Sequence, residues 1–217
     1  MCKLGGKDRA ELVLVHGLWM NRFILWPLAW RLRHRDWRLR FFSYFSTLHP
    51  YERHPERLVA RLENSSANAI YLVGHSMGGV VIMSALSQLS DHARRKIAGV
   101  VTLGTPLNGS AAGLQFMHHD LGRLLMGSSR KLWQTFPVLE IPADIRVGQI
   151  AGTRRVGLGR FFAKLDGPND GVVTVDETRL PGLTDHLVMP VSHTGMLFSK
   201  NVARQCLAFL RDGRFLS

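Results

Sequence analysis

The residue best placed to act as a nucleophile is Ser76, which lies in a Gly-x-Ser-x-Gly motif spanning residues 74–78. The run 70–73 before it is apolar and typical of a buried strand, and the stretch after the motif is typical of a helix. A serine at a sharp strand-to-helix turn exposes its hydroxyl, with backbone N–H groups of the helix N-terminus beside it. Gly74 and Gly78 lack Cβ atoms that would collide there. The motif predicts catalysis by a serine hydroxyl; a simple glycine-rich turn is the alternative.

Such a serine needs a base to take its proton, and that base needs an acid to orient it. Among the ten histidines, His193 in Val-Ser-His-Thr-Gly-Met follows the last expected strand directly. It therefore lies on a loop at the carboxyl edge of the predicted sheet, within reach of Ser76. The histidines at 118 and 119 fall in a long insert, and His186 falls within a strand. We predict that His193 is the base.

The acid is predicted to be Asp170, which lies in the turn Gly-Pro-Asn-Asp-Gly-Val-Val at residues 167–173. Glycine, proline and asparagine fix such a turn without regular structure and can hold a side chain in place. An aspartate with only a turn-forming role is the alternative. Asp166, Asp176 and Asp185 are rival acids, and Asp176 is the strongest of them.

The negative charge of a tetrahedral intermediate needs two backbone N–H donors. One is expected from Met77, the residue after the nucleophile. The other is expected from the loop His-Gly-Leu-Trp at residues 16–19, where Gly17 lets the backbone come close. We predict the N–H of Leu18 as the second donor; a tight turn with no role is the alternative.

Apolar segments that alternate with helical stretches must position these residues. Strands are expected at 12–15, 38–44, 69–73, 97–103, 145–151 and 186–191, and helices at 23–33 (interrupted early by Pro27), 55–62, 77–89 and 199–211. Continuous apolar strands alternating with helices predict an α/β fold: one domain over 1–217, with about six parallel strands covered by helices on both faces. Ligands bind such sheets beyond the carboxyl ends of the strands.

Residues 109–140 interrupt the alternation between the fourth and fifth strands. This insert is too apolar for a bare loop, so it is either a helical cap over the site or ordinary core packing. Its place after a strand end favours a cap or an acyl-binding wall. The residues expected to line an apolar pocket are Trp19, Phe23, Thr105, Leu107, Met117 and Leu121.

The chain is strongly basic, with 28 Lys and Arg against 16 Asp and Glu in 217 residues, a formal net charge of +12. The simplest interpretation is a solvated basic face; an anionic membrane surface ranks second, and nucleic acid is an unlikely partner because no nucleic-acid motif accompanies the charge. No apolar run is long enough to span a membrane and no signal-peptide core is visible. We therefore expect a cytoplasmic protein, with membrane-surface association as one option, or a mature form whose leader is absent.

Taken together, the motifs resemble those of the α/β-hydrolase superfamily, in its small serine lipase and esterase branch. The matching pieces are Val-His-Gly-Leu-Trp at 15–19, the serine motif, Leu-Gly-Thr-Pro at 103–106, Asn-Asp-Gly-Val-Val at 169–173 and His-Thr-Gly-Met at 193–196. The resemblance implies a minimal α/β-hydrolase fold that lacks two leading antiparallel strands. It also implies hydrolysis of small-molecule or lipid esters through an acyl-enzyme, with no metal or organic cofactor.

The same resemblance assigns Ser76, Asp170 and His193 to the catalytic triad, and Leu18 and Met77 to the oxyanion hole. A carboxylic-ester hydrolase acting on an apolar acyl group is the leading hypothesis. A thioesterase, acyltransferase or amidase would use the same residues. A non-catalytic, basic membrane- or nucleic-acid-binding protein on this scaffold is the remote alternative.

Overall fold

A six-stranded sheet forms the centre of the computed structural model, which describes residues 10–156 and 165–216. The strand order is β2-β1-β3-β4-β5-β6, and every neighbouring pair is parallel. The strands are β1 (Ala10–Val15), β2 (Trp37–Phe42), β3 (Ile70–His75), β4 (Ile97–Leu103), β5 (Val147–Gly152) and β6 (Asp185–Met189). The predicted six-stranded parallel sheet is confirmed.

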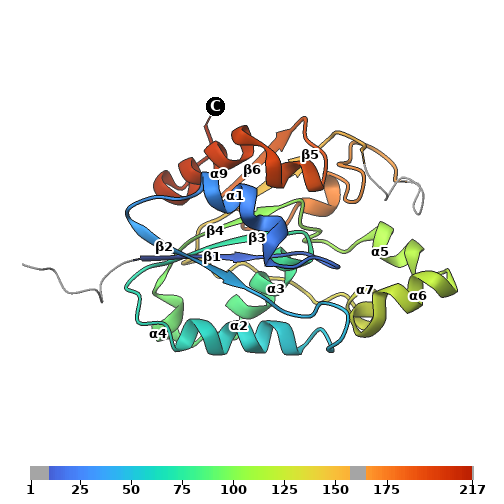
Figure 1. The fold of residues 1–217 in the computed structure, drawn as a ribbon, viewed down its shortest axis with the longest axis horizontal. Coiled ribbons are helices and arrows are strands. Elements are labelled where there is room, and N and C mark those ends of the chain that lie inside the picture. Colours follow the sequence, from blue (N-terminus) through green and yellow to red (C-terminus); the bar gives the residue numbers. More distant parts are fainter. Residues whose placement is uncertain (1–9, 157–164, 217) are drawn as a thin grey trace, which may run out of the picture.

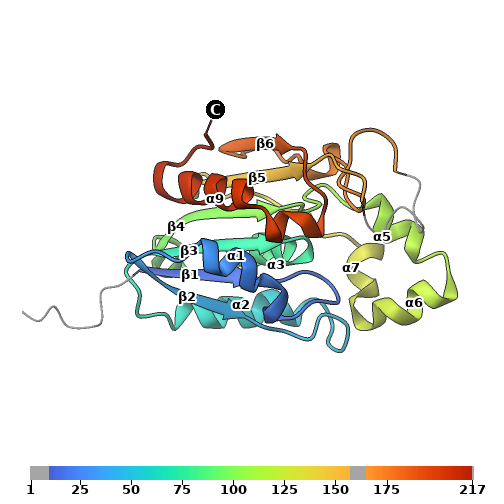
Figure 2. The same cartoon turned by 45° about the horizontal axis from the view of Figure 1, so that its top comes forward.

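Helices cover both faces of this sheet, as Figures 1 and 2 show. On one face lie α1 (Trp26–Arg31) and α9 (Lys200–Asp212), with the short 3-10 helices η1 (Arg22–Leu25) and η4 (Thr194–Phe198). On the other face lie α2 (Arg53–Glu63), α3 (Met77–Leu86) and α4 (Asp91–Arg94). A third 3-10 helix, η3 (Asp176–Thr178), follows the loop that carries Asp170. The predicted α/β layering is therefore confirmed.

Strand β1, which lies between β2 and β3, shows why two helical layers are needed. Its side chains alternate between faces: Leu12 and Leu14 pack with α1 and α9, while Val13 and Val15 pack with α2 and α3. All four are fully buried. Burying an aliphatic side chain of this size contributes roughly 1.5–3 kcal/mol, so both faces of the strand stabilise the fold.

Several predicted boundaries were wrong by a few residues, and proline explains two of them. The helix expected over 23–33 is η1 followed by α1, and Pro27 lies in the first turn of α1, where a missing N–H costs nothing. The last strand ends at Met189 because Pro190 cannot donate a ladder hydrogen bond. The one-turn helix α4, capped by the hydroxyl of Ser90, was not predicted.

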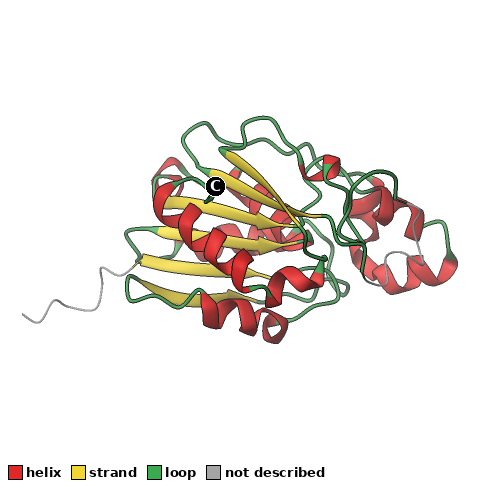
Figure 3. Cartoon of the chain, turned by 90° about the horizontal axis from the view of Figure 1, so that it is seen from above, coloured by secondary structure: helices red, strands yellow, loops and turns green. Residues whose placement is uncertain are grey.

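The insert forms four short helices beyond the carboxyl ends of the strands: α5 (Ala111–Phe116), α6 (Asp120–Met126), η2 (Gly127–Ser129) and α7 (Arg130–Gln134). Figures 2 and 3 show them projecting past the sheet. Phe116, Met126, Leu132 and Trp133 point inward and join the core on the α2–α3 side. Over the described residues, none of the helices is both long enough and apolar enough to cross a membrane.

His54 is a fully buried histidine on α2, packed between the rings of Tyr44 and Tyr51. Neither ring nitrogen finds a hydrogen-bond partner among the described residues. Burial, with help from the nearby Arg57 charge, lowers the pKa of His54 to about 4. His54 is therefore neutral in the folded protein at neutral pH.

We expect His54→Phe to flatten the loss of stability in acid. An unfolded histidine has a pKa near 6.5, so between about pH 6.5 and 4 the unfolded chain binds the extra proton and acid favours unfolding. His54 should account for about 2 kcal/mol of the free energy of unfolding lost between about pH 8 and pH 5. Urea unfolding of wild type, His54→Phe and a control at exposed His92 checks this. An unchanged pH slope in His54→Phe would contradict it.

Candidate active site at the carboxyl edge of the sheet

Ser76 sits at the sharp turn between β3 and α3 with φ 54° and ψ −127°. Among the described residues, it and Trp19 are the two non-glycine residues with positive φ. This strained backbone is held by its hydrogen bonds: the N–H of Ser76 donates to Leu103 O at 2.9 Å, and the carbonyl of Ser76 accepts from Gly79 N at 2.9 Å and the Thr105 hydroxyl at 3.1 Å. Strain that the surroundings fix in this way is typical of functional sites.

The two motif glycines allow α3 to start directly against the strands. A Cβ on Gly78 would lie 2.5 Å from His16 O and 2.8 Å from the carbonyl carbon of Val15. A Cβ on Gly74 would lie 2.7 Å from Gly79 Cα. The steric reason predicted for both glycines is confirmed.

Asp170 and His193 form a buried hydrogen-bonded pair. His193 Nδ1 lies 2.7 Å from Asp170 Oδ2, and the two residues are 6% and 1% exposed. The other carboxylate oxygen accepts the N–H groups of Val172 at 2.9 Å and Val173 at 2.8 Å. Because a carboxylate only accepts, this contact assigns the proton to Nδ1 and leaves Nε2 of His193 as the basic nitrogen.

The end of β4 connects this pair with the serine turn. Leu103 accepts the N–H of Ser76, and the next residue, Gly104, has φ 54°. A Cβ on Gly104 would lie 2.9 Å from Asp170 Oδ2 and 3.0 Å from His193 Nδ1. The Ser76 turn and the Asp170–His193 pair therefore both lie beside the end of β4, at one edge of the sheet.

His75 provides a second connection that the sequence analysis missed. Its Nε2 donates to the backbone carbonyl of His193 at 3.0 Å, and the two rings are 4.7 Å apart. Burial, followed by the nearby His193 ring, lowers the pKa of His75 to about 3, so His75 is neutral. In the sequence, only the position of His75 next to Ser76 indicated a role, and the motif allows any residue at that position.

The rival acids lie elsewhere. Asp176 has a side chain that is 92% exposed and faces Arg179 at 3.6 Å. Asp185, at the start of β6, accepts the N–H groups of His186 and Phe215. Asp166 is exposed. Of the four aspartates considered, Asp170 is the one in contact with His193.

The loop after β1 brings Leu18 close to the nucleophile, since a Cβ on the preceding Gly17 would lie 3.0 Å from Ser76 Cβ. The loop is fixed by Tyr44, whose ring stacks on His16 and whose hydroxyl donates to His16 O at 2.7 Å. Within the described residues, no hydrogen-bond acceptor meets the backbone N–H of Leu18 or Met77. Both N–H groups are therefore available to a bound group.

The residues predicted to line a pocket are Trp19, Phe23, Thr105, Leu107, Met117 and Leu121, and they fall into a buried and an exposed group. Thr105, Leu107 and Met117 are buried, and the Thr105 hydroxyl donates a hydrogen bond to the carbonyl of Ser76. Trp19 is half-exposed and contacts the insert: its Nε1 donates a hydrogen bond to Leu125 O at 2.8 Å. Phe23 and Leu121 are exposed at the surface of η1 and α6.

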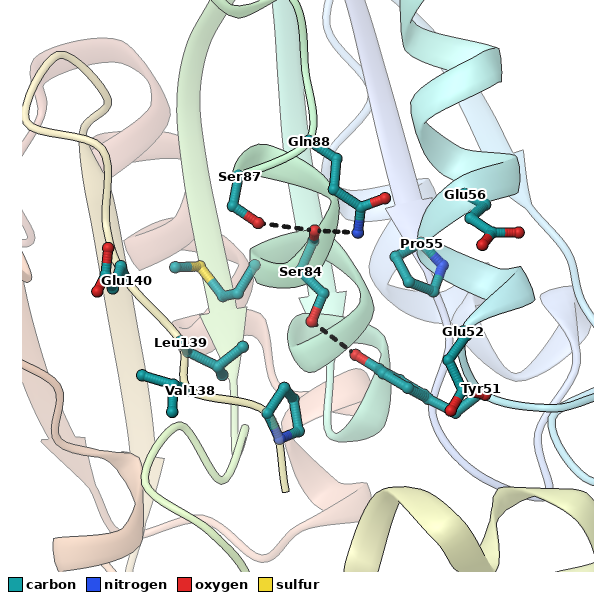
Figure 4. A pocket seen from close by; sticks show the side chains of 12 residues that line it. Tyr51, Glu52, Pro55, Glu56, Ser84, Ser87, Gln88, Val138, Leu139 and Glu140 are labelled. Atoms are coloured by element: carbon teal, nitrogen blue, oxygen red, sulfur yellow. Dashed lines mark hydrogen bonds between the residues drawn. The ribbon is translucent and has the colours of Figure 1, made fainter. Parts of the chain in front are cut away.

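A hollow of about 350 Å³ lies between α2, α3 and residues 137–140, as Figure 4 shows. At its wall the Tyr51 hydroxyl lies 2.8 Å from the Ser84 hydroxyl, and Ser87 and Gln88 donate to the Ser84 carbonyl. Ser84 is eight residues along α3 from Ser76, about 12 Å of helix. This hollow is therefore separate from the candidate active site. The described residues hold no group of three or more His, Cys, Asp or Glu placed to bind a metal ion.

Comparison with known proteins gives a family match and a set of similar structures. A family model described as a PGAP1-like alpha/beta domain matches residues 51–155, just under half of the chain, and this range includes Ser76. No curated protein sequence matches the chain. The mature form of the Bacillus licheniformis lipase BlEst2 is 21% identical, with a TM-score of 0.63 over 89% of this chain and 88% of the lipase.

Two further structures have the same fold. The metagenomic carboxyl esterase MGS0156 is 20% identical, with a TM-score of 0.62 over 95% of this chain and 75% of the esterase. The RedJ thioesterase of the prodiginine pathway in Streptomyces coelicolor is 14% identical, with a TM-score of 0.62 over 94% of this chain and 85% of the thioesterase. The chain therefore has the fold of the α/β-hydrolases.

The sheet of this chain has six strands, all parallel. The resemblance inferred from the motifs and the predicted fold are both confirmed. At these levels of identity the likeness concerns the fold, and members of one fold carry out different reactions. The chemistry of this protein therefore has to be argued from its own side chains.

Proposed function

We propose that this α/β-hydrolase cleaves carboxylic esters through an acyl-enzyme on Ser76. The observation that carries the proposal is the buried Asp170–His193 pair, 2.7 Å between Oδ2 and Nδ1, at the same edge of the sheet as the strained Ser76 turn. A serine, a histidine with Nε2 as its basic nitrogen and a buried carboxylate are the parts that acyl transfer on a serine uses.

In the proposed reaction, Nε2 of His193 takes the proton of the Ser76 hydroxyl as its oxygen attacks the ester carbonyl carbon. The resulting imidazolium then gives that proton to the leaving alcohol, and the acyl group stays on Ser76. A water molecule, deprotonated by the same Nε2, releases the carboxylic acid and regenerates the serine. The buried Asp170 stabilises the imidazolium during both steps.

The N–H groups of Leu18 and Met77 are the proposed oxyanion donors. Their availability and the position of the loop beside Ser76 support this role. Each such donor lowers the barrier because it is already aimed where negative charge develops. Removing one donor of this type typically costs about 10²–10³-fold in kcat.

We also propose that the insert at 109–140 acts as a cap and forms one wall of an apolar acyl site. Its helices lie beyond the strand ends, and Trp19, next to the proposed oxyanion residue, is bonded to Leu125 and packs on Phe116. The exposed leucines of α6 supply apolar surface on the same element. Small-molecule or lipid esters with an apolar acyl group are the proposed substrates.

The similar structures include a lipase, a carboxyl esterase and a thioesterase, which supports acyl transfer to water in general. The thioesterase makes thioester hydrolysis a second candidate, since it would use the same acyl-enzyme and differ only in the leaving group. Parallel assays with ester and thioester substrates of equal chain length distinguish the two.

Hydrolysis of p-nitrophenyl esters from acetyl to palmitoyl tests the proposal. We expect turnover by the wild type and a covalent adduct at Ser76 after treatment with a fluorophosphonate, because the activated hydroxyl attacks phosphorus as it attacks a carbonyl. Ser76→Ala, which should remain folded, is expected to lose both. Turnover retained in folded Ser76→Ala would contradict the proposed mechanism, and turnover of thioesters alone would replace the ester assignment.

A further inference from the structure

A stripe of aromatic side chains lies on the outer surface of η1 and α1. Phe23, Trp26 and Trp30 are 63%, 52% and 62% exposed. Their spacing of three and four residues places them on one side of the helical segment, whereas Leu25 and Leu28 face the core. Phe198 on η4, which contacts α1, is also about half exposed. The fold does not use these rings for its core.

The two sequence segments that form this face carry basic residues but no acidic ones. The sequence has no Asp or Glu between Glu11 and Asp36, and none between Asp185 and Asp212. These two acid-free segments pack together, because α1 contacts both α9 and η4 on the same face of the sheet. The +12 charge of the chain is therefore partly concentrated beside the exposed aromatic rings.

A hollow of about 390 Å³ opens between α1 and α9 beside the stripe. Its walls are formed by Trp30, Arg31, Lys200, Ala203, Arg204 and Leu207. Arg31 is positioned by a hydrogen bond from its guanidinium to Pro27 O at 2.7 Å, and its buried Nε has no partner among the described residues. Three cations and an indole, with no carboxylate in the wall, favour an anionic group such as a phosphate.

We propose that this face, formed by η1, α1, η4 and the start of α9, docks onto an anionic lipid bilayer. The aromatic stripe enters the headgroup region, and the hollow lined by Arg31, Lys200 and Arg204 receives a lipid phosphate. Half-exposed tryptophan and phenylalanine beside arginine and lysine are the combination that an interfacial helix uses. Each basic residue near an anionic membrane adds electrostatic attraction, which salt screens.

The docking face is connected to the candidate active site at two points along the chain. The 3-10 helix η1 follows the loop that carries Leu18, and η4 begins directly after His193. A bilayer bound here would hold the site near lipid esters in the membrane. This last consequence rests on the proposed function, whereas membrane binding itself does not.

Co-sedimentation with vesicles tests the proposal. We expect the wild type to bind vesicles in which about a third of the lipid is phosphatidylglycerol, to bind pure phosphatidylcholine vesicles much more weakly, and to lose affinity at about 0.5 M NaCl. W26S/W30S and K200Q/R204Q should each weaken binding about tenfold or more. Ser76→Ala should bind as the wild type does, so a failure of the proposed chemistry leaves this test intact.

Two control variants test whether vesicle binding depends on this face or only on the net charge and the exposed apolar area of the protein. R53Q/R57Q removes the same charge from α2 on the opposite face of the sheet, and F45S/L48S removes exposed apolar groups from the loop after β2. Both are expected to retain vesicle binding, and thermal unfolding verifies that all variants fold. Equal losses in the control and test variants would overturn the proposal, as would the absence of binding to anionic vesicles. Binding to an oligonucleotide but not to vesicles would replace the lipid with nucleic acid.

Discussion

Asp170→Asn is expected to lower kcat for ester hydrolysis by about 10³–10⁴-fold while the protein remains folded. The reason lies in the contacts of the two carboxylate oxygens. Oδ1 accepts the N–H groups of Val172 and Val173, so the amide oxygen of an asparagine would take that place. Its NH₂ group would then face Nδ1 of His193, where the native carboxylate accepts a hydrogen bond from the Nδ1–H group.

An NH₂ group facing Nδ1 reverses the tautomer of His193. Nδ1 must then accept, the proton moves to Nε2, and the nitrogen facing the substrate side can no longer take the proton of Ser76. The substitution changes almost no volume, keeps the two side-chain hydrogen bonds from Val172 and Val173, and reverses the direction of the third, to His193. Its effect should therefore be on kcat rather than on the free energy of unfolding.

Steady-state kinetics with a soluble p-nitrophenyl ester, together with urea unfolding, check this expectation. Asp176→Asn is the matched control, because Asp176 was the strongest rival in the sequence and its side chain is largely exposed. It should keep kcat within about twofold of the wild type. Equal kcat in Asp170→Asn and Asp176→Asn would refute the role of Asp170.

The fold was predictable because each element carries its own periodic signal. β4 was placed at 97–103 without error, since a buried parallel strand reads as a continuous apolar run. The boundaries that were wrong depend on tertiary contacts or on local proline geometry. Examples are the short α4, which Ser90 caps, and the end of β6 before Pro190.

The candidate nucleophile, acid and base could be proposed from sequence because each follows a strand or a turn with recognisable chemistry. The groups that hold them together could not. His75 bonds to a residue 118 positions away, and Gly104 matters because its missing side chain leaves space for Asp170 and His193. Neither contact produces a pattern along the chain. The concentration of charge on the α1–α9 face has the same origin, since the two acid-free segments are 150 residues apart and meet only in the fold.

Gly78→Ala is expected to impair stability and activity together. The added methyl group would lie 2.5 Å from His16 O and in still closer contact with Val15 O, both of them backbone atoms that cannot rotate away. The start of α3 must therefore move away from the end of β1. Overpacking of this kind costs about 1–3 kcal/mol, and a backbone clash lies at the upper end of that range.

The same displacement changes the proposed oxyanion hole, because Met77 precedes Gly78 on α3 and Leu18 follows the clashing β1 end. A shift of about 1 Å between two such donors can cost about 10²-fold in rate. Gly99→Ala on β4 is the matched control: its Cβ would meet neighbours no closer than 3.7 Å, so it should change stability by less than about 1 kcal/mol and leave kcat unchanged.

Urea unfolding and kcat/KM, both measured at a temperature where each variant is folded, separate the two effects. If Gly78→Ala matched Gly99→Ala in both measurements, the close packing of α3 on β1 would not be what positions the site. A loss of stability with normal kcat/KM would support the close packing of α3 on β1 but contradict the proposed oxyanion hole. A joint loss in Gly78→Ala alone would show that the glycine required by the strand-to-helix turn also sets the geometry in which Ser76 reacts.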